Sequence, residues 1–102
     1  MEIKRAVDAL AALAQGTRLE IFRALVQRGP EGLPAGAIAA RLDLPGPTLS
    51  FHLAQLKRAG LVSCERDGRS LIYAADYPAI EGLVTYLTEN CCGRRRTSRA
   101  AS

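Results

Sequence analysis

Residues 33–75 read LPAGAIAARLDLPGPTLSFHLAQLKRAGLVSCERDGRSLIYAA, and this stretch decides the fold. Its apolar spacing and its proline and glycine residues predict a helix over 35–42, a turn over 43–46 and a second helix to about residue 59. Two strand-like runs, 61–66 and 70–75, flank Asp67-Gly68, which is a typical hairpin turn. A helix-turn-helix followed by such a hairpin, or wing, places its second helix in the major groove of DNA.

Helices are also expected on both sides of this stretch. Helical spacing predicts a first helix that ends near Gln15-Gly16 and a second that Gly29-Pro30 stops, followed by a loop over 29–34. Thr17 and Glu20 have the spacing of a capping box at the start of the second helix, and Asp76 is expected to cap a last helix. The apolar stripes of these three helices are Ile3, Val7, Leu10, Leu13 and Ala14; Leu19, Ile21, Phe22, Leu25 and Val26; and Ile80, Leu83, Val84 and Leu87.

The size of the chain predicts a single domain. It has 102 residues, 48% of them hydrophobic, and no Trp, so we expect a core of Leu, Ile, Val and Ala. A small helical domain often completes its core by dimerising. Residues 1–92 are therefore expected to form a mainly α, homodimeric winged helix-turn-helix domain, in the order four helices, two strands and one helix. Residues 93–102 are expected to be a basic tail without stable structure.

The charge and the cysteines indicate the partner and the compartment. The formal net charge of +4 fits a nucleic-acid partner, although part of it lies in the tail, at Arg94, Arg95, Arg96 and Arg99. We expect neither a signal peptide nor a membrane-spanning helix. The three cysteines are odd in number and two are adjacent, which is not a secreted disulfide framework. The cytoplasm, with reduced thiols, is the expected location.

The helix that begins near residue 47 has a core face and an outward face. Leu49, Leu53 and Leu56 recur at i, i+4 and i+7 and are expected to face the core. The opposite face and its flanks carry the candidate DNA-contacting residues, which are Pro47, Thr48, Ser50, Phe51, His52, Gln55 and Arg58. An amphipathic helix of a small bundle shows the same spacing, but the helix–turn–helix–hairpin order favours a DNA-reading helix.

Several of these positions have two interpretations. Phe51 on an outward face needs a partner, either the methyl group of thymine or a neighbouring core element. His52 is the single histidine, without carboxylates nearby for a zinc site, so it bonds either to phosphate or to its own chain. Arg66 and Arg69 beside the hairpin turn either reach a phosphate or the minor groove, or belong to a solvated hairpin tip.

The segments TRLEIFRAL, AARLDLPGPTLSFHLAQLKRAGLV and ERDGRSLIYAA resemble the ArsR/SmtB family of winged-helix metal-responsive repressors, over about residues 5–92. The resemblance implies a homodimer, built mainly from the first and last helices, that binds operator DNA and leaves it when a metal or metalloid binds. By position, Pro47, Thr48, Ser50, Phe51 and His52 match the DNA-contacting stretch of that family.

Two common metal sites of the family are missing from this sequence. The helix AGAIAARL has no C-x-C cluster, and the last helical segment, YPAIEGLVTYLTEN, has no His for a zinc site. Instead, Cys91-Cys92 resembles the pair of a branch that senses trivalent arsenic through adjacent cysteines just after the last helix. Relatives in that branch have a third thiol shortly beyond the pair, near the position of Ser98 in this chain.

The chemistry of the thiols fits a soft inducer. Thiolates favour trivalent arsenic or antimony, whereas adjacent cysteines do not easily form a disulfide with each other, because their Cα atoms are only about 3.8 Å apart. The arginines over 94–96 are expected to favour the thiolates. Cys64 is either a small buried strand residue or a third ligand, from the same subunit or across the dimer. Both inorganic and methylated arsenicals are candidate inducers, and no other cofactor is expected.

Four alternatives remain open for the cysteines and the fold. The two adjacent thiols can be incidental at a frayed helix end. The switch can be thiol oxidation, through a disulfide between Cys64 and a tail cysteine or between subunits. A thiol enzyme with Cys91 or Cys92 as nucleophile is disfavoured, because the chain has no C-x-x-C and its single His lies on the DNA-side helix. A protein-interaction winged helix would lack salt-dependent DNA binding.

Overall fold

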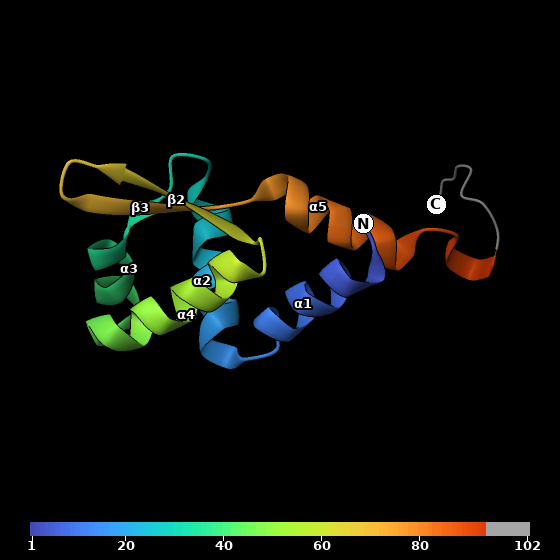
Figure 1. Cartoon of the computed structure of the whole chain (residues 1–102), viewed down its shortest axis with the longest axis horizontal. Coiled ribbons are helices and arrows are strands. Elements are labelled where there is room, and N and C mark those ends of the chain that lie inside the picture. Colours follow the sequence, from blue (N-terminus) through green and yellow to red (C-terminus); the bar gives the residue numbers. More distant parts are fainter. Residues whose placement is uncertain (94–102) are drawn as a thin grey trace.

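The computed structural model describes residues 1–93 of the chain and confirms the mainly helical winged helix-turn-helix (Figure 1). The elements are α1 (Ile3–Leu13), α2 (Gly16–Arg28), β1 (Leu33–Pro34), α3 (Ala35–Leu42), α4 (Gly46–Arg58), β2 (Val62–Asp67), β3 (Ser70–Ala75), α5 (Tyr77–Thr88) and the short 3-10 helix η1 (Cys91–Gly93). The tail prediction falls on residues 94–102, outside the described residues, except for Gly93, which belongs to η1.

The wing is part of a three-stranded antiparallel sheet in the order β1-β3-β2. The hairpin pairs Val62 with Ala75 at its base and Asp67 with Ser70 at its tip. The prediction of a loop over 29–34 is wrong for its last two residues, because Leu33 and Pro34 pair with Tyr73 and Ile72 of β3. A two-residue strand has no periodicity of its own, so only its pairing with β3 defines it.

The core lies between the helices and the base of the sheet, and α4 contributes its predicted face. Leu49, Leu53 and Leu56 are 2%, 1% and 0% exposed, which confirms the face assigned from their spacing. The buried residues as a whole are Ala6, Ala9, Ala12, Ile21, Phe22, Ala24, Leu25, Ile38, Leu49, Leu53, Leu56, Leu61, Val62, Ala75 and Leu83.

The helix start predicted at Thr17 is wrong, and the one at Asp76 is right. Gln15 is the extended residue before α2, and its side-chain Oε1 accepts a hydrogen bond from the Arg18 N–H at 2.8 Å. Thr17 is already inside the helix, so it cannot cap it. At α5, Asp76 Oδ1 accepts from the Ala79 N–H at 3.1 Å, as expected for an N-cap.

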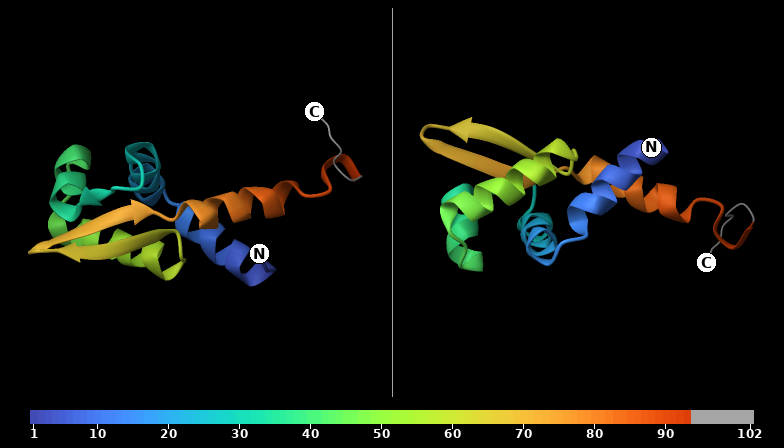
Figure 2. Two further views of the ribbon diagram at one scale, coloured as in Figure 1. Left: turned by 90° about the horizontal axis from the view of Figure 1, so that it is seen from above. Right: turned by 60° about the horizontal axis from the view of Figure 1, so that its bottom comes forward.

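Large apolar side chains remain exposed on the two terminal helices. On α1 the buried residues are the small alanines, whereas Ile3, Val7 and Leu10 are 67%, 55% and 42% exposed. On α5, Val84 and Leu87 are 54% and 56% exposed. Figure 2 shows α1 beside α5, at the end of the molecule away from the hairpin tip. Part of each predicted stripe is therefore exposed, although Leu83 of α5 is buried in the core.

None of the helices within residues 1–93 is both long enough and apolar enough to cross a membrane.

Gly32 is the glycine on which the β1–β3 pairing depends. Its φ is +72°, and a Cβ there would overlap the backbone carbonyl of Tyr73. We expect Gly32→Ala to lower the free energy of unfolding by at least about 2 kcal/mol, since the left-handed conformation alone costs about 1–2 kcal/mol. Gly36→Ala is the matched control, because a Cβ at this helical position meets nothing within 4 Å. Urea denaturation measures both, and equal stability of the two variants would contradict the prediction.

Candidate nucleic-acid interface

The predicted reading face of α4 is exposed at its start and partly covered further along. Pro47, Thr48, Ser50 and Phe51 are exposed, and no side chain caps the first turn of the helix. Its backbone N–H groups therefore remain available to an anion such as a DNA phosphate. Figure 1 shows this first turn and the hairpin tip at the same end of the molecule.

Phe51 does not pack into the core, so its predicted core partner is not found within residues 1–93. Its side chain is 59% exposed, and its ring meets the His52 ring edge-on with the centroids 5.6 Å apart. Thymine remains the predicted partner of this ring.

His52 bonds to its own chain, which is one of its two predicted interpretations. Its Nδ1 lies 3.3 Å from Nη1 of Arg18, a residue of α2. Arg18 also donates through Nε to the carbonyl oxygen of Ala12, at 2.8 Å. The sequence did not indicate Arg18, because a contact across 34 residues leaves no local pattern.

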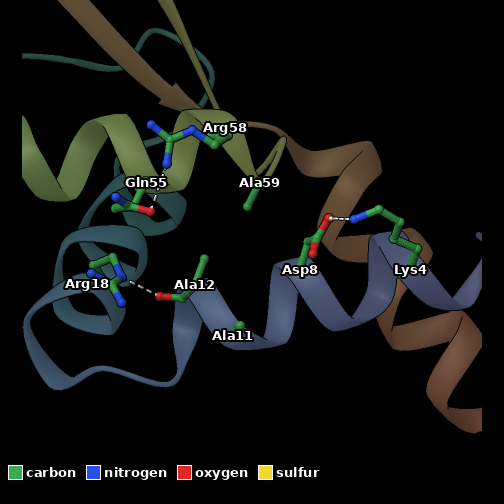
Figure 3. A pocket seen from close by; sticks show the side chains of 8 residues that line it. All are labelled: Lys4, Asp8, Ala11, Ala12, Arg18, Gln55, Arg58 and Ala59. Carbon is green, nitrogen blue, oxygen red and sulfur yellow. Dashed lines mark hydrogen bonds and ion pairs between the residues drawn. The ribbon is translucent and has the colours of Figure 1, made fainter.

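A cavity of about 440 Å³ lies between α1, α2 and α4 (Figure 3). Gln55 and Arg58 reach it from α4 and are hydrogen-bonded to each other at 3.2 Å, so both predicted contact residues share one surface. The Lys4 ammonium pairs with the Asp8 carboxylate at 3.3 Å. Arg18 and Arg58 also line the cavity, and neither forms an ion pair with Asp8. This surface favours an anionic partner. The lining residues are Lys4, Asp8, Ala11, Ala12, Arg18, Gln55, Arg58 and Ala59.

The two wing arginines are free to reach a partner. Arg66 and Arg69 lie exposed on either side of the hairpin turn, and neither forms an ion pair with any residue of the part that the structure describes. This arrangement is consistent both with a phosphate contact and with a solvated tip.

The adjacent cysteines lie exposed in η1, which begins after Glu89 and Asn90 at the end of α5. Their Sγ atoms are 3.5 Å apart, and Cys92 has a left-handed φ of 66°. The hydrogen bond shared with the Cys91 thiol, and the repulsion between two thiolates, raise the pKa of Cys92 above its ordinary value. The predicted effect of the arginines over 94–96 lies outside the described residues.

Within one protomer, Cys64 lies far from Cys91 and Cys92. It is half-buried on β2 opposite Tyr73, whose pKa is raised first by burial and then by the neighbouring Cys64 thiol. The 12 residues of α5, about 18 Å of helix, separate the sheet from η1. Residues 1–93 contain no group of three or more His, Cys, Asp or Glu side chains that could hold a metal ion. A ligand from across a dimer stays a prediction.

Known proteins are similar to this chain, both over the helix-turn-helix and over most of its length. A family described as a helix-turn-helix domain matches residues 13–65. The transcriptional activator HlyU of Vibrio cholerae is 31% identical over 88 residues, which cover 86% of this chain and 79% of HlyU. The regulator KmtR of Mycobacterium tuberculosis is 31% identical over 78 residues, and the chain spans 58% of its length. These relatives are regulators and not enzymes, as predicted.

Solved structures extend the likeness over the wing and the terminal helices. An ArsR-like transcriptional regulator from Rhodococcus is 28% identical, with a TM-score of 0.74 over 83% of this chain and 77% of that one. The homodimeric winged helix-turn-helix domain Mb0332 of Mycobacterium bovis is 28% identical, with a TM-score of 0.71 over 84% and 78%. Reduced HlyU from Vibrio cholerae is 30% identical, with a TM-score of 0.69 over 87% and 90%. The chain therefore belongs to the DNA-binding helix-turn-helix transcriptional regulators, and among them to the winged-helix regulators of the ArsR type.

Proposed function

We propose that the chain is a cytoplasmic repressor that binds operator DNA as a homodimer and is released when trivalent arsenic or antimony binds Cys91 and Cys92. The observation that carries the proposal is the pair of exposed thiols, 3.5 Å apart, at the end of the helix whose apolar face is free. The direction of regulation is part of the proposal, because the relative HlyU is named an activator.

The free apolar faces of α1 and α5 support the homodimer. Val7 and Leu10 on α1 and Val84 and Leu87 on α5 are between 42% and 56% exposed, and a second copy would cover them. The structurally similar Mb0332 domain is homodimeric. A two-fold dimer would read an inverted repeat whose half-site centres are about 10 bp apart, or a multiple of that distance.

The separation of the two sulfurs fits a single atom bound by both thiolates. Two sulfurs bonded at about 2.3 Å to a tetrahedral atom lie about 3.8 Å apart. The two sulfurs are 3.5 Å apart, close to this distance, so both can bind one atom with little rearrangement. Trivalent arsenic and antimony are soft and favour thiolate ligands in a pyramidal arrangement. Two thiolates leave a third position for a hydroxide, a methyl group or a further thiol.

Arsenite binding exchanges oxygen ligands for sulfur. Two As–O bonds of arsenous acid break, two As–S bonds form, and each thiol proton leaves with a hydroxide as water. A divalent cation such as Cd²⁺ must instead displace the thiol protons into solution. The two inducers therefore differ in how their binding depends on pH.

This difference gives a prediction. Since the pKa of Cys92 is raised, its thiol keeps its proton over a wider pH range, and Cd²⁺ has to displace that proton. We expect release of DNA by Cd²⁺ to need less metal as the pH rises through neutrality, while release by arsenite changes little. The measurement is the concentration of Cd²⁺ or of arsenite that releases half of the DNA, determined at several pH values around neutrality. A steep pH dependence for arsenite would argue against exchange with loss of water.

Oxidation of the same thiols is the second candidate. Cys91 and Cys92 are exposed, and the relative HlyU has been solved in a form described as reduced. A disulfide from Cys64 to the pair within one protomer is disfavoured by the length of α5 between them. A disulfide between the η1 segments of two subunits remains the redox alternative.

One experiment separates these functions. The reduced protein is titrated onto labelled DNA from upstream of its own gene, with and without arsenite, antimonite, Cd²⁺, Zn²⁺ and peroxide. Release by arsenite and antimonite supports the proposal, and release by peroxide alone supports the redox alternative. Absence of salt-dependent DNA binding would leave a protein-interaction module.

The DNA surface gives a separate prediction. Ser50→Ala and Thr48→Ala should weaken operator binding by about 1–3 kcal/mol each if they contact base edges. Arg69→Ala should weaken binding to all DNA sequences alike and reduce the salt slope by about 1, because it removes a phosphate contact. Fluorescence anisotropy at several salt concentrations measures these effects. Unchanged affinity in all three folded variants would place the DNA surface elsewhere.

A further inference from the structure

Arg18 is the residue that connects three helices at the candidate interface. It belongs to α2, and its backbone N–H is held by Gln15 Oε1 at 2.8 Å. Its Nε donates to the carbonyl oxygen of Ala12 at 2.8 Å, and its Nη1 lies 3.3 Å from His52 Nδ1. One half-buried side chain therefore spans the end of α1 and the middle of α4.

The contact with α1 satisfies a helix end. Ala12 is in the last turn of α1, where carbonyl oxygens have no partner inside the helix. No basic residue lies in that turn of α1, so Arg18 supplies the positive charge that a helix C-terminus favours.

The contact with α4 fixes the proton on the imidazole ring. A guanidinium only donates hydrogen bonds, so Nδ1 of His52 must be the acceptor. The neutral ring then carries its proton on Nε2, the nitrogen farther from the backbone. In this state His52 offers a donor, which suits a phosphate oxygen or guanine N7 and O6, but not the amino group of adenine or cytosine.

We propose that Arg18 is a positioning residue for DNA reading: it holds His52 as an Nε2–H donor and ties α4 to the end of α1. This inference rests on the proposed DNA interface, to which His52 belongs. Arg18 is not part of the buried core but lines the open cavity of Figure 3, so its loss leaves no closed void. Its effect is therefore expected on DNA affinity more than on folding.

The test is a double-mutant cycle between Arg18 and His52 in the full chain. Arg18→Met keeps the length of the side chain and removes the donors, and His52→Ala removes the ring. Each should lower operator affinity about tenfold, as for loss of one charge-assisted hydrogen bond. The double variant should bind no more weakly than His52→Ala alone. Additive losses would show that Arg18 acts independently of His52, and would overturn the proposal.

Two controls separate positioning from charge and from folding. Arg23→Met removes the same charge from an exposed position of α2 and should leave the preference for operator over random DNA unchanged. Arg18→Lys keeps the charge but loses the planar fork, so it should lower that preference while binding random DNA normally. A folded Arg18→Met or Arg18→Lys protein with the full preference would overturn the inference.

A spectroscopic measurement covers the case in which the variants do not fold. Nitrogen NMR of the wild-type His52 ring, in mildly alkaline buffer, should show an unprotonated Nδ1 and a protonated Nε2. The opposite tautomer would overturn the proposal without any variant. If the wild-type protein binds no DNA at all, the proposed function fails, whereas normal binding by Arg18→Met removes only this inference.

Discussion

Replacing Cys91 and Cys92 together by serine is expected to abolish the release of operator DNA by arsenite and to leave DNA affinity within about twofold of wild type. Serine hydroxyls are hard ligands that do not replace thiolates on trivalent arsenic. Both positions are exposed in η1, at the far end of α5 from the hairpin and outside the core, so the substitutions leave the DNA face intact (Figure 1).

The single variants and Cys64 refine this result. The single variants Cys91→Ser and Cys92→Ser should each lose the response to arsenite, because one thiol cannot hold the arsenic atom. Cys64→Ser is the matched control. Full loss of the response to arsenite would show that Cys64 is a third ligand, contributed across the dimer. A retained response would show a site with two thiols. Release measured by anisotropy is the readout. Normal release from the Cys91→Ser, Cys92→Ser double variant would rule out the cysteine-pair sensor.

Placing carboxylates on the free apolar face is expected to give a folded monomer with at least about a hundredfold lower operator affinity. Val7→Asp with Leu87→Asp alters side chains that are 55% and 56% exposed in the single chain, so the monomer tolerates them. A dimer that covers the same positions would bury unpaired charges, which is costly. Loss of the second subunit also removes the gain of binding two half-sites together.

Sedimentation and footprinting check this prediction. Leu19→Asp is the matched control, because Leu19 is 42% exposed but belongs to α2, which is not one of the two helices whose apolar faces are proposed to form the dimer. It should leave the dimer and the affinity unchanged. A wild-type protein that sediments as a monomer at micromolar concentration, or protects one half-site only, would contradict the dimer.

The elements around the wing were predictable because their signals are local. Pro47 lies in the first turn of α4 and Gly60 follows its end, while Leu49, Leu53 and Leu56 mark its core face by spacing alone. The same reasoning failed at β1, which exists only through pairing with β3, and at the start of α2. There the chain already turns into the helix at Gly16, one residue before the predicted Thr17 cap.

The site was predictable in its residue types but not in its connections. Spacing showed that α1 carries an apolar stripe, but not that Ala6, Ala9 and Ala12 would be buried while Val7 remains exposed. The reason is that helix α1 approaches the core closely, and small side chains allow that approach. Arg18 was missed because its role depends on His52, which only the folded chain brings near it.

The junction between the sheet and α5 has a kinetic consequence. The N–H of Asp76, between β3 and α5, donates to the carbonyl oxygen of Leu61 at 2.8 Å, and the Leu61 N–H donates to Leu56 of α4 at 3.0 Å. On its other edge β3 pairs with β1, directly before α3. We therefore expect a tilt of α5 to move the wing and α4 together. Dissociation from DNA should then follow a single exponential. We expect no intermediate in which the wing has dissociated from the DNA while α4 remains in the major groove.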